Sequence, residues 1–593
     1  MKKFFINFLN KTKIQPDIWF FFGFLLTFSL SIRKVLFYFP IQRTFNEYAN
    51  LHICLSDIFL IMAISLWLFT ILSHTKLNLS RSNLWITQFI HQLYLVLPLL
   101  LVFWSFTSIF WSQNQILALF RSLKILEFYL LYLYMIFRII PLFYYSEKKT
   151  IVPRGTIFNY KEQDIFVIII IVTSLFQSFI GIAQFIFQKS LGLVFLKESI
   201  ISPTLPGIAK LVFNKHKIIR AYGLMPHPNI LGGFLLFSII ITLLYKQLFH
   251  VEQFENSIIK DQGGLYISFK KWFLRNLWLI KAILIIQILA LLLSFSKSAI
   301  IGLLIALVFI YYKSDKKSKK MFHVEHFHIW LLLFLIFLVS SFLIFKPDLN
   351  SIFIKSLKER LFYLNVPRGT FLTNPLRGVG AGQFILAMPH FYKNVLLPWQ
   401  FQPIHNVFLL ILSELGIIGL IIFVWWILQL FHVEQLSYHD KAKLQQIASF
   451  ALLKRKDENK VKNQNKDETI SYHNNNSNCS TWNNLNRKDL HKTFNNTRNL
   501  DYSRNNSITK QNLTLQKEKI HFKENRVGES ISILYNNYCY LSMIYFQSIL
   551  LGFIFIMFFD HYLWDIQQGS LMFWMIAGLI IGLKNILYLK SHN

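Results

Sequence analysis

Charged residues are scarce in this chain of 593 residues. Asp, Glu, Lys and Arg together make up 15% of the sequence, whereas soluble domains carry about a quarter. Cysteine is also rare, and Cys54, Cys479 and Cys539 lie too far apart for a metal-binding spacing or a disulfide framework. The composition therefore argues against a soluble protein, a cysteine-based metal domain and a disulfide-stabilised domain.

Hydrophobic and basic residues are abundant instead. Hydrophobic residues make up 54% of the chain, and the mean hydropathy is +0.43. The net charge of +32 raises the question of nucleic-acid binding. However, the basic residues lie mainly in short segments between apolar runs and in one polar block, without a helix-turn-helix pattern or an aromatic platform. We interpret them as topology signals and as contacts with anionic membrane lipid, and we expect no nucleic-acid partner.

Long apolar runs predict an all-α, polytopic integral membrane protein. A bilayer core requires about 20 apolar residues in a helix, because lipid cannot hydrogen-bond an open backbone. About twelve segments meet this requirement, and Arg33 and Lys34 interrupt the first of them. The predicted spans are Ile18–Phe39, Asp57–Leu72, Phe89–Trp111, Leu117–Ile140, Asp164–Phe187, Asn229–Leu248, Leu277–Ser294, Ala299–Tyr312, Phe327–Phe345, His405–Leu430, Asn537–Phe559 and Ser570–Leu589.

Lysine and arginine are concentrated in alternate loops, which orients the predicted helices. The clusters that fall on one side are the start of the chain, loops 73–88, 141–163, 249–276 and 313–326, and Lys590. The positive-inside rule makes this side, and both termini, cytoplasmic. Loop 188–228 is an exception, because it carries several lysines and yet falls outside.

The predicted spans divide the chain into parts. Residues 1–345 form a membrane domain with helices 1–9, 346–404 a long extracytoplasmic loop, 405–430 helix 10, 431–536 a cytoplasmic insert, and 537–593 helices 11 and 12. The basic insert is rich in Asn and poor in aromatic residues, so it cannot bury enough apolar surface to fold alone. We expect it to be disordered.

Short peptides recur in the chain and bear on metal binding. FHVE occurs at 249–252, 322–325 and 431–434, VPRGT at 152–156 and 366–370, and CSTWN at 479–483. All three peptides can be reading frames of one palindromic DNA sequence. Our hypothesis is that they are mobile DNA repeats tolerated in exposed loops, where insertions cost little. The His–Glu pairs that look like metal ligands then have another origin, and we expect no metal site.

Polar residues gather at the predicted outer ends of the helices. Arg220 and His227 precede a helix that Asn229 is expected to cap, and a cation near a helix N-terminus suits a phosphate. Lys297 follows in a tight polar link between two spans, where ordinary snorkelling is the alternative. Arg377 precedes closely spaced glycines whose N–H groups either surround an anion or only form a turn.

The tenth predicted span begins with another polar pair, His405 and Asn406. Histidine can act as a base near neutral pH, although a single interfacial histidine more often caps or hydrogen-bonds. Deeper in the span, Glu414 is expected to face protein or water, and Gly416 with Gly419 to allow close helix packing. Two further polar groups, Arg121/Lys124/Glu127 and Asp560–Asp565, are interpreted as an internal ion cluster and as a lining of the outer mouth.

Taken in order, these motifs resemble the O-antigen ligase and polymerase family of bacterial membrane glycosyltransferases. The resemblance covers about residues 165–430, and the ending Asp560–Trp564 is also similar. The motifs that carry it are R220…HPN229, SFSKS294–298, the Gly378/Gly380 loop and HN405–406 with GIIG416–419. It implies transfer of a glycan from undecaprenyl diphosphate to a hydroxyl of a sugar, lipid-linked glycan or protein, without metal or cofactor, at the bacterial cytoplasmic (inner) membrane.

The resemblance also implies roles for single residues. Arg220 would hold the diphosphate and His405 would activate or orient the acceptor hydroxyl. Lys297 stands where the family often has Arg, and a single ammonium lacks the bidentate fork. Arg377, with His227 and Asn406, completes the predicted substrate-binding set.

Two other classes of function remain open on the sequence. A transporter or flippase of a lipid-linked or anionic solute usually places charge and broken helices near the midplane of repeated halves. Here the clustered charges fall at the outer mouth and no repeated half is visible. A sensor or scaffold would act through the insert, whose composition offers no folded recognition surface.

Overall fold

The computed structural model describes residues 15–74, 92–144, 160–213, 216–256, 277–313, 358, 360–392, 394–431 and 539–591. They belong to one compact unit, Met1–Val433 with Tyr538–Asn593, while a second unit, Glu434–Asn537, contains no described residue. The predicted span Phe327–Phe345, both chain ends and all of the predicted insert except Phe431 lie outside the described residues.

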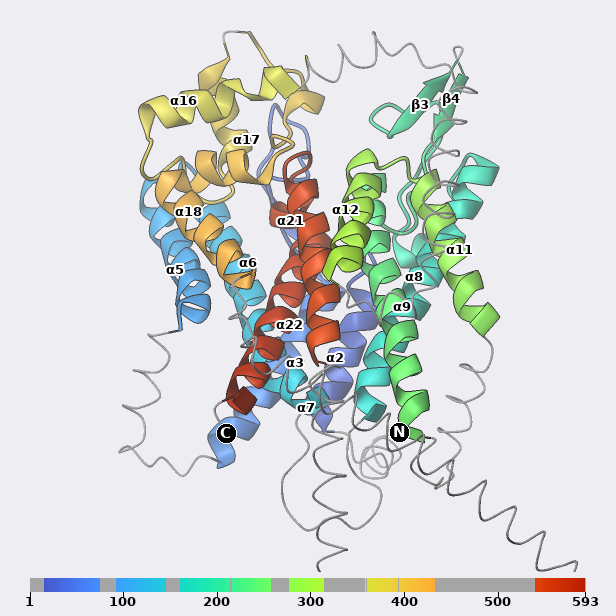
Figure 1. The fold of residues 1–593 in the computed structure, drawn as a ribbon. Helices are drawn as coiled ribbons and strands as arrows, with labels where there is room; N and C mark the ends of the chain where they lie inside the picture. Colours follow the sequence, from blue (N-terminus) through green and yellow to red (C-terminus); the bar gives the residue numbers. More distant parts are fainter. Residues whose placement is uncertain are drawn as a thin grey trace, which may run out of the picture. The chain divides into compact units, whose positions relative to one another are not determined.

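Helices make up most of the described unit (Figure 1). The main ones are α2 (Pro16–Thr27), α3 (Leu55–His74), α5 (Leu93–Thr107), α6 (Gln115–Tyr134), α7 (Ile140–Tyr144), α8 (Tyr160–Phe187), α9 (Pro228–Asn256), α11 (Leu277–Leu293), α12 (Lys297–Lys313), α18 (Val407–Phe431), a helix at Cys539–Met557 and α22 (Gln567–Ser591). Short helices lie between them: α16 (Asn365–Thr373), α17 (Phe384–Ala387), α21 (Tyr562–Asp565), the π-helical turn η2 (Met135–Ile139), and the 3₁₀ turns η1 (Ser108–Trp111), η3 (Val194–Leu196), η4 (Met388–Phe391) and η5 (Pro398–Gln400).

Eight helices in the described part are long and apolar enough to cross a membrane. They run over Leu55–Ser73, Leu93–Trp111, Gln115–Leu142, Glu162–Phe187, Pro228–Leu248, Val407–Phe431, Cys539–Met557 and Gln567–Leu587. The predicted helical membrane architecture is confirmed, whereas the predicted count of twelve spans is not. The helices α9, α12, α18 and α22 begin in the upper half of Figure 1, which we call the site end.

The first predicted span, Ile18–Phe39, is wrong in its second half. The helix α2 stops at Thr27 after 12 residues, about 18 Å of helical rise. The chain then forms the strand β1 (Arg33–Tyr38), which pairs antiparallel with β2 (Asn50–Cys54). The two basic residues that open β1 disfavour a lipid-embedded helix, and Val35, Phe37 and Tyr38 favour a strand.

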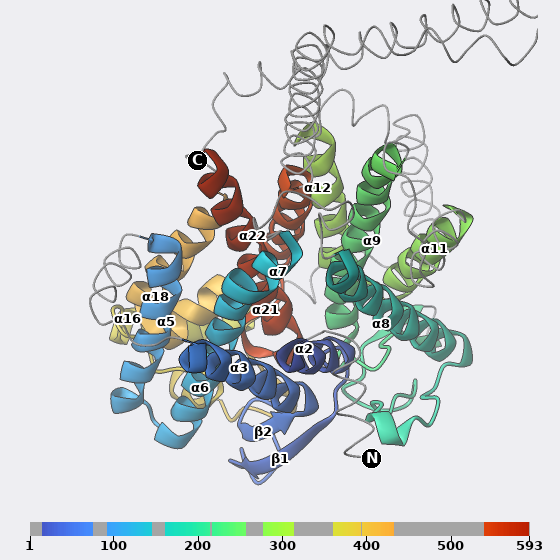
Figure 2. The ribbon, with the colours of Figure 1, turned by 90° about the horizontal axis from the view of Figure 1, so that it is seen from below.

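Two small hairpins accompany the helices at the site end. In the first, Arg33 pairs with Cys54 and Tyr38 with Asn50, with a bulge between Val35 and Phe37. Seen from below, this hairpin lies beyond α2 and α3 at the edge of the bundle (Figure 2). In the second, β3 (Lys210–Phe213) pairs with β4 (His216–Ile219) above the ends of α8 and α9.

Aromatic residues and close helix contacts form the core. Trp426 of α18 lies 4.4 Å from Trp574 of α22, measured between ring centroids, and Tyr132 of α6 contacts both rings. The helix α12 approaches the helix Cys539–Met557 at two glycines, where a Cβ atom on Gly302 would lie 2.9 Å from the carbonyl oxygen of Gly552. The absence of side chains at these two positions therefore sets the distance between the helices.

The repeated peptides do not all lie in exposed loops, contrary to our expectation. Residues 366–370 form part of α16, with Val366 and Thr370 fully buried, and residues 249–252 continue α9. Proline near the start of a helix needs no N–H partner, which explains why VPRGT is compatible with α16. The origin of these peptides as DNA repeats stays a hypothesis, and the copy at 366–370 is part of the packed structure. The copies at 152–156, 322–325 and 479–483 lie outside the described residues.

Candidate functional site

The segment before α9 is arranged differently from the predicted N-cap. Pro228 is the first helical residue, where its missing N–H costs nothing. His227 caps the helix, because its Nδ1 accepts the N–H of Asn229 at 3.2 Å. Burial and the charge of Arg220 lower the pKa of His227 to about 3, which keeps the ring neutral for this role. The side chain of Asn229 is thereby free for other contacts.

Arg220 donates hydrogen bonds to two acceptors through Nε and Nη2, which leaves its Nη1 available for a ligand. Its Nε donates to the carbonyl oxygen of Ser294 at 2.7 Å, in the link between α11 and α12, and its Nη2 donates to Oδ1 of Asn229 at 2.5 Å. Burial lowers the pKa of Arg220 to about 10, so the side chain remains charged at neutral pH. No carboxylate among the described residues forms an ion pair with it. The remaining Nη1 donors suit an anionic ligand.

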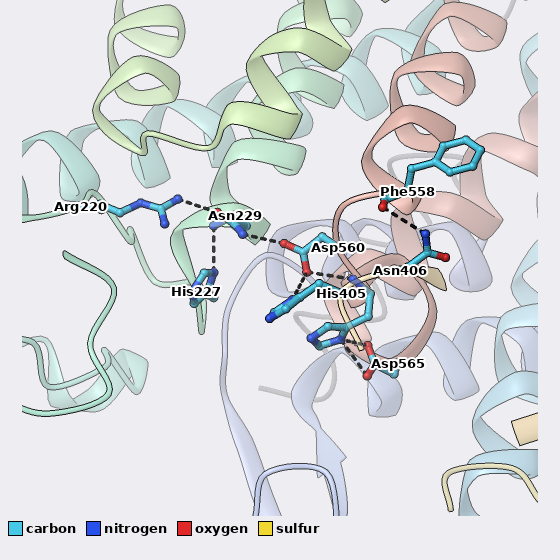
Figure 3. Close-up of polar contacts among 9 residues, drawn as sticks. Arg220, His227, Asn229, His405, Asn406, Phe558, Asp560 and Asp565 are labelled. Carbon is cyan, nitrogen blue, oxygen red and sulfur yellow. Dashed lines mark hydrogen bonds and ion pairs between the residues drawn. The ribbon is translucent and has the colours of Figure 1, made fainter. Parts of the chain in front are cut away.

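Asn229 and Asp560 connect this arginine to His405 (Figure 3). Nδ2 of Asn229 donates to Oδ2 of Asp560 at 2.6 Å, and Oδ1 of Asp560 lies 3.6 Å from Nδ1 of His405. Asp560 follows the helix Cys539–Met557 and is almost fully buried, whereas 37% of the His405 side chain is exposed. The arrangement aims a partly accessible imidazole at a buried carboxylate.

The charge of Asp560 is protected by its surroundings. Burial alone would raise the pKa of this carboxyl group, but the contact with His405 and the nearby imidazoles hold the pKa below its usual range. The carboxylate therefore persists at neutral pH and stabilises positive charge on the His405 ring. A base that becomes an imidazolium during a reaction gains from such a partner.

A second histidine, His561, lies next to the first. Its Nδ1 is 2.8 Å from Oδ1 of Asp565, and its ring centroid is 5.2 Å from that of His405 and 5.6 Å from that of Tyr48. Burial opposes a charge on this ring, but the carboxylates, Asp565 above all, raise the pKa of His561 overall. The backbone N–H of His561 donates to Asp560 at 2.9 Å. The site thus holds two imidazoles, each with its own carboxylate.

The other predicted residues lie at differing places around this cluster. Lys297 is exposed at the first position of α12, three residues beyond the Ser294 carbonyl that binds Arg220. Asn406 caps α18 by accepting the N–H of Leu409 at 2.9 Å, and it donates to the carbonyl of Phe558 at 3.1 Å. Asn406 therefore joins the start of α18 to the end of the helix that precedes Asp560, and its expected role in substrate binding stays a prediction.

Arg377 does not join the cluster in the described part of the chain. Its guanidinium carbon lies 5.8 Å from the ring centroid of Trp111 in a cation–π contact. The N–H groups of the glycine loop that follows are also occupied: Val379 donates to the carbonyl of Ser413 at 2.9 Å, and Gly380 to that of Glu414 at 2.7 Å. These two N–H groups are therefore not available to surround an anion, and the glycine loop binds backbone carbonyl groups of α18 instead.

The helix α18 is broken where this loop meets it, which corrects the expected role of Gly416. Gly416 has φ 68° and ψ −171°, and a Cβ atom there would lie 2.2 Å from the carbonyl oxygen of Leu376. The break frees carbonyl groups of α18 inside the span, and the loop N–H groups and Nε1 of Trp104 bind them. Glu414 is buried at the break, as expected, and accepts N–H groups of Gly382 and Phe384.

A cavity of about 40 Å³ lies between the break and the site. Its walls include Arg121, Glu414, Lys124 and Asp565, and its size admits roughly three water molecules. The predicted ion cluster of α6 is present here: Lys124 pairs with Glu127 at 3.0 Å and also with Asp57 of α3. Arg121 instead donates to the carbonyls of Asp565 and Tyr48, both at 3.1 Å. The cavity is too small for a sugar.

Potential metal donors also meet at the site. One donor atom each from His405, Asp560 and His561 lie within 4.8 Å of one another. However, Asp560 is already bonded through both oxygens, to Asn229 on one side and to the two histidines on the other. The residues therefore satisfy one another without an ion, and the expected absence of a metal stays a prediction.

Sequence reasoning missed the residues that join the cluster. The sequence predicts that Asp560 lines the mouth and that Asn229 caps a helix, and although both belong to motifs that resemble the family, neither is predicted as a site residue. The available signal was the polar group Asp560–Asp565 placed between two apolar helices, because buried charges in that position need partners. Which partners they have depends on four segments that are distant in sequence.

Comparison with known proteins supports the resemblance seen in the motifs. Residues 282–424 match the model of a family described as O-Antigen ligase, and this match supports the resemblance to the O-antigen ligase family. The matched part contains Lys297, Arg377, His405 and Asn406 but not Arg220. It supports a membrane glycosyltransferase-like role in polysaccharide biosynthesis. Comparison with curated proteins and with solved structures gave no match.

Proposed function

We propose that this chain transfers a glycan from undecaprenyl diphosphate to an acceptor hydroxyl at the outer face of the bacterial cytoplasmic membrane. The acceptor is a sugar, a lipid-linked glycan or a protein. The family match supports a ligase or polymerase type of enzyme, and the lysine and arginine pattern of the loops supports cytoplasmic termini. Both reactants then meet at the site end.

The observation that carries the proposal is a line of contacts from Arg220 through Asn229 and Asp560 to His405. At one end of this line lies a cation that has no carboxylate partner among the described residues, and at the other end lies a partly exposed imidazole. A phosphate-linked sugar needs both: a cation for the departing diphosphate and a base for the incoming hydroxyl.

The proposed reaction is a single displacement at the anomeric carbon. The acceptor oxygen forms a bond to this carbon while the bond from the carbon to the diphosphate oxygen breaks. The hydroxyl proton moves to the ring of His405, and the diphosphate leaves with the bonding electrons. Arg220 binds the negative charge that grows on the leaving group, with Lys297 nearby on the α12 terminus. Asp560 is a positioning residue that stabilises the imidazolium formed on His405.

One observation favours the transporter alternative. The helix α18 is broken at Gly416, and charged residues lie at the same depth, as in many transporters. However, the glycine loop fills the break through hydrogen bonds, and the adjoining cavity holds only a few waters. Neither feature provides a passage for a glycan or for a lipid headgroup.

Reconstitution separates these functions. The purified chain in lipid nanodiscs receives a lipid-linked glycan and candidate acceptors, and products are identified by mass. We expect transfer by the wild type and none by His405→Ala or Arg220→Ala, while the exposed control variants His390→Ala and Arg368→Ala retain it. Near-normal transfer by either site variant would defeat the assignment. Movement of the glycan across proteoliposomes without transfer would support the transporter instead.

A further inference from the structure

The β1–β2 hairpin exposes an apolar surface outside the membrane-spanning helices. All residues of β1 from Lys34 to Tyr38 are exposed, with Leu36 and Phe37 exposed by 57% and 56%. Tyr38 packs edge-to-face on Phe45 beyond the strand, at 5.6 Å between ring centroids. Because β1 pairs only with β2, neither face of the strand nor its outer edge is covered by the described part of the chain.

The position of the hairpin limits what can cover it. Cys54 at the end of β2 is followed directly by Leu55, the first residue of the membrane-spanning helix α3. The strands are therefore attached at the boundary of the bilayer, and six residues of β1 extend only about 20 Å. Figure 2 shows the hairpin beside the bundle, outside α2 and α3, rather than over the helix ends. A hairpin in this position is close enough to the end of α3 to contact the membrane surface.

The charge of the hairpin matches an anionic surface. Residues 32–54 contain Arg33, Lys34 and Arg43 but a single acid, Glu47. Arg33 is paired with Glu47 at 2.5 Å, whereas Lys34 and Arg43 are exposed and have no carboxylate partner among the described residues. Basic residues interspersed with exposed aromatic and aliphatic side chains favour the headgroup region of a bilayer that contains anionic phospholipid.

The inner side of the same hairpin contacts the site. Nε2 of Gln42 donates to the carbonyl of Leu396 at 2.5 Å, and Nδ2 of Asn46 donates to the carbonyl of Phe401 at 3.0 Å. These carbonyls belong to the segment that leads into His405. Further along, the ring of Tyr48 lies against His561.

We propose that the β1–β2 hairpin docks on the anionic phospholipid surface of the site-end leaflet and holds the segment before His405 at headgroup level. Leu36, Phe37 and Phe45 enter the interface, while Lys34 and Arg43 bind lipid phosphates. The second part rests on the proposed function, because a lipid-linked diphosphate is confined to the same level. The docking itself is independent of any reaction.

Spin labels test the docking directly. Cys54 and Cys539 are buried, so single cysteines are introduced in a Cys479→Ser background as Leu36→Cys and Phe37→Cys. The matched control is Lys217→Cys, an exposed strand residue of the other hairpin. In nanodiscs with phosphatidylglycerol, we expect labels at 36 and 37 to collide with dissolved oxygen more often than with an aqueous nickel chelate. The control label should show the opposite.

The alternatives give other readings. Labels at 36 and 37 that match the Lys217→Cys control would place the hairpin in water, and labels protected from both reagents would place it against a second copy or another protein. Either result overturns the proposal. The double variant Lys34→Gln/Arg43→Gln should reduce the oxygen preference about as much as replacing phosphatidylglycerol by phosphatidylcholine. An undiminished preference would remove the role of anionic lipid.

The same samples keep the two proposals distinct. The collision measurement uses no donor or acceptor, so its failure leaves the transfer reaction untouched. The variant Leu36→Ser/Phe37→Ser should lower transfer at least threefold while retaining the thermal stability of the wild type. Full transfer by this variant would refute the positioning of His405 by the hairpin.

Discussion

Replacing Asp560 by Asn tests the charge that supports His405. The substitution keeps the size of the side chain but removes its charge, at a distance of 3.6 Å from Nδ1 of His405. Two unit charges at this distance interact by about 4.6 kcal/mol at an effective dielectric constant of about 20. Since 37% of the His405 side chain is exposed, solvent screening leaves roughly half, about 2 kcal/mol. If this charge acts only on the imidazolium formed during transfer, the rate falls about 30-fold.

The assay is single-turnover transfer from a lipid-linked glycan at saturating donor, so that binding does not contribute. The matched control is Asp17→Asn, which also removes a buried carboxylate from an ion pair, with Nε of Arg138 at 2.6 Å, but in the first turn of α2. We expect the control to keep the wild-type rate, and thermal unfolding of both variants shows whether folding is affected. A rate for Asp560→Asn within threefold of the wild type would refute the reasoning.

Further predictions concern binding, folding, pH and metals. Arg220→Lys should raise the donor KM at least 10-fold, because an ammonium lacks the planar fork whose separate nitrogens reach the Ser294 carbonyl, Asn229 and an anion in different directions. An unchanged KM in steady-state assays would contradict this. Gly416→Ala should lower the free energy of unfolding by about 1–3 kcal/mol from backbone strain alone, and further through the clash of its Cβ atom with Leu376. The control Gly192→Ala should lower it less, because the φ of 82° is similar but the added Cβ atom would meet nothing. Equal melting temperatures of the two variants would contradict this prediction. The pKa of His561 is raised because nearby carboxylates outweigh burial. Protonation of His561 therefore stabilises the folded protein fully below about pH 6.5, and this stabilisation is lost as the pH rises through the pKa of the folded state. The melting temperature should fall over this pH range in the wild type but not in His561→Gln. Chelation of divalent metals should leave transfer unchanged, because Asp560 is bonded through both oxygens by protein groups; loss of transfer that added metal restores would refute this.

Local patterns in the sequence predicted the helices well, because hydrophobic length is a strong signal in a membrane protein. The prediction Asp164–Phe187 differs from the observed span Glu162–Phe187 by two residues at one end. The prediction failed for the first span, where the apolar run is helical only in its first half and then continues as a strand. The basic residues Arg33 and Lys34 begin that strand rather than interrupt a helix. The apolar content of such a segment does not distinguish these two structures.

The candidate site was predicted less completely than the fold. Arg220 and His405 stood out because each precedes an apolar helix that has no structural need for it. Asp560 and Asn229 were not placed in the site, because their importance depends on hydrogen bonds between segments 331 residues apart. Arg377 was grouped with the cluster for its charge and its side of the membrane alone, and its stacking on Trp111 could not be read from spacing.

The break in α18 has a consequence for how the protein is made. The half of α18 before Gly416 covers only about 14 Å, so neither half crosses a bilayer alone, and carbonyls exposed at the break have no partner in lipid. The loop that binds them, including Val379 and Gly380, precedes α18 in the chain. A translocating ribosome therefore delivers the loop before the helix it will complete. We expect α18 to enter the membrane as one continuous helix and to open at Gly416 only when the loop docks, which makes the docking of the loop a late step of biogenesis.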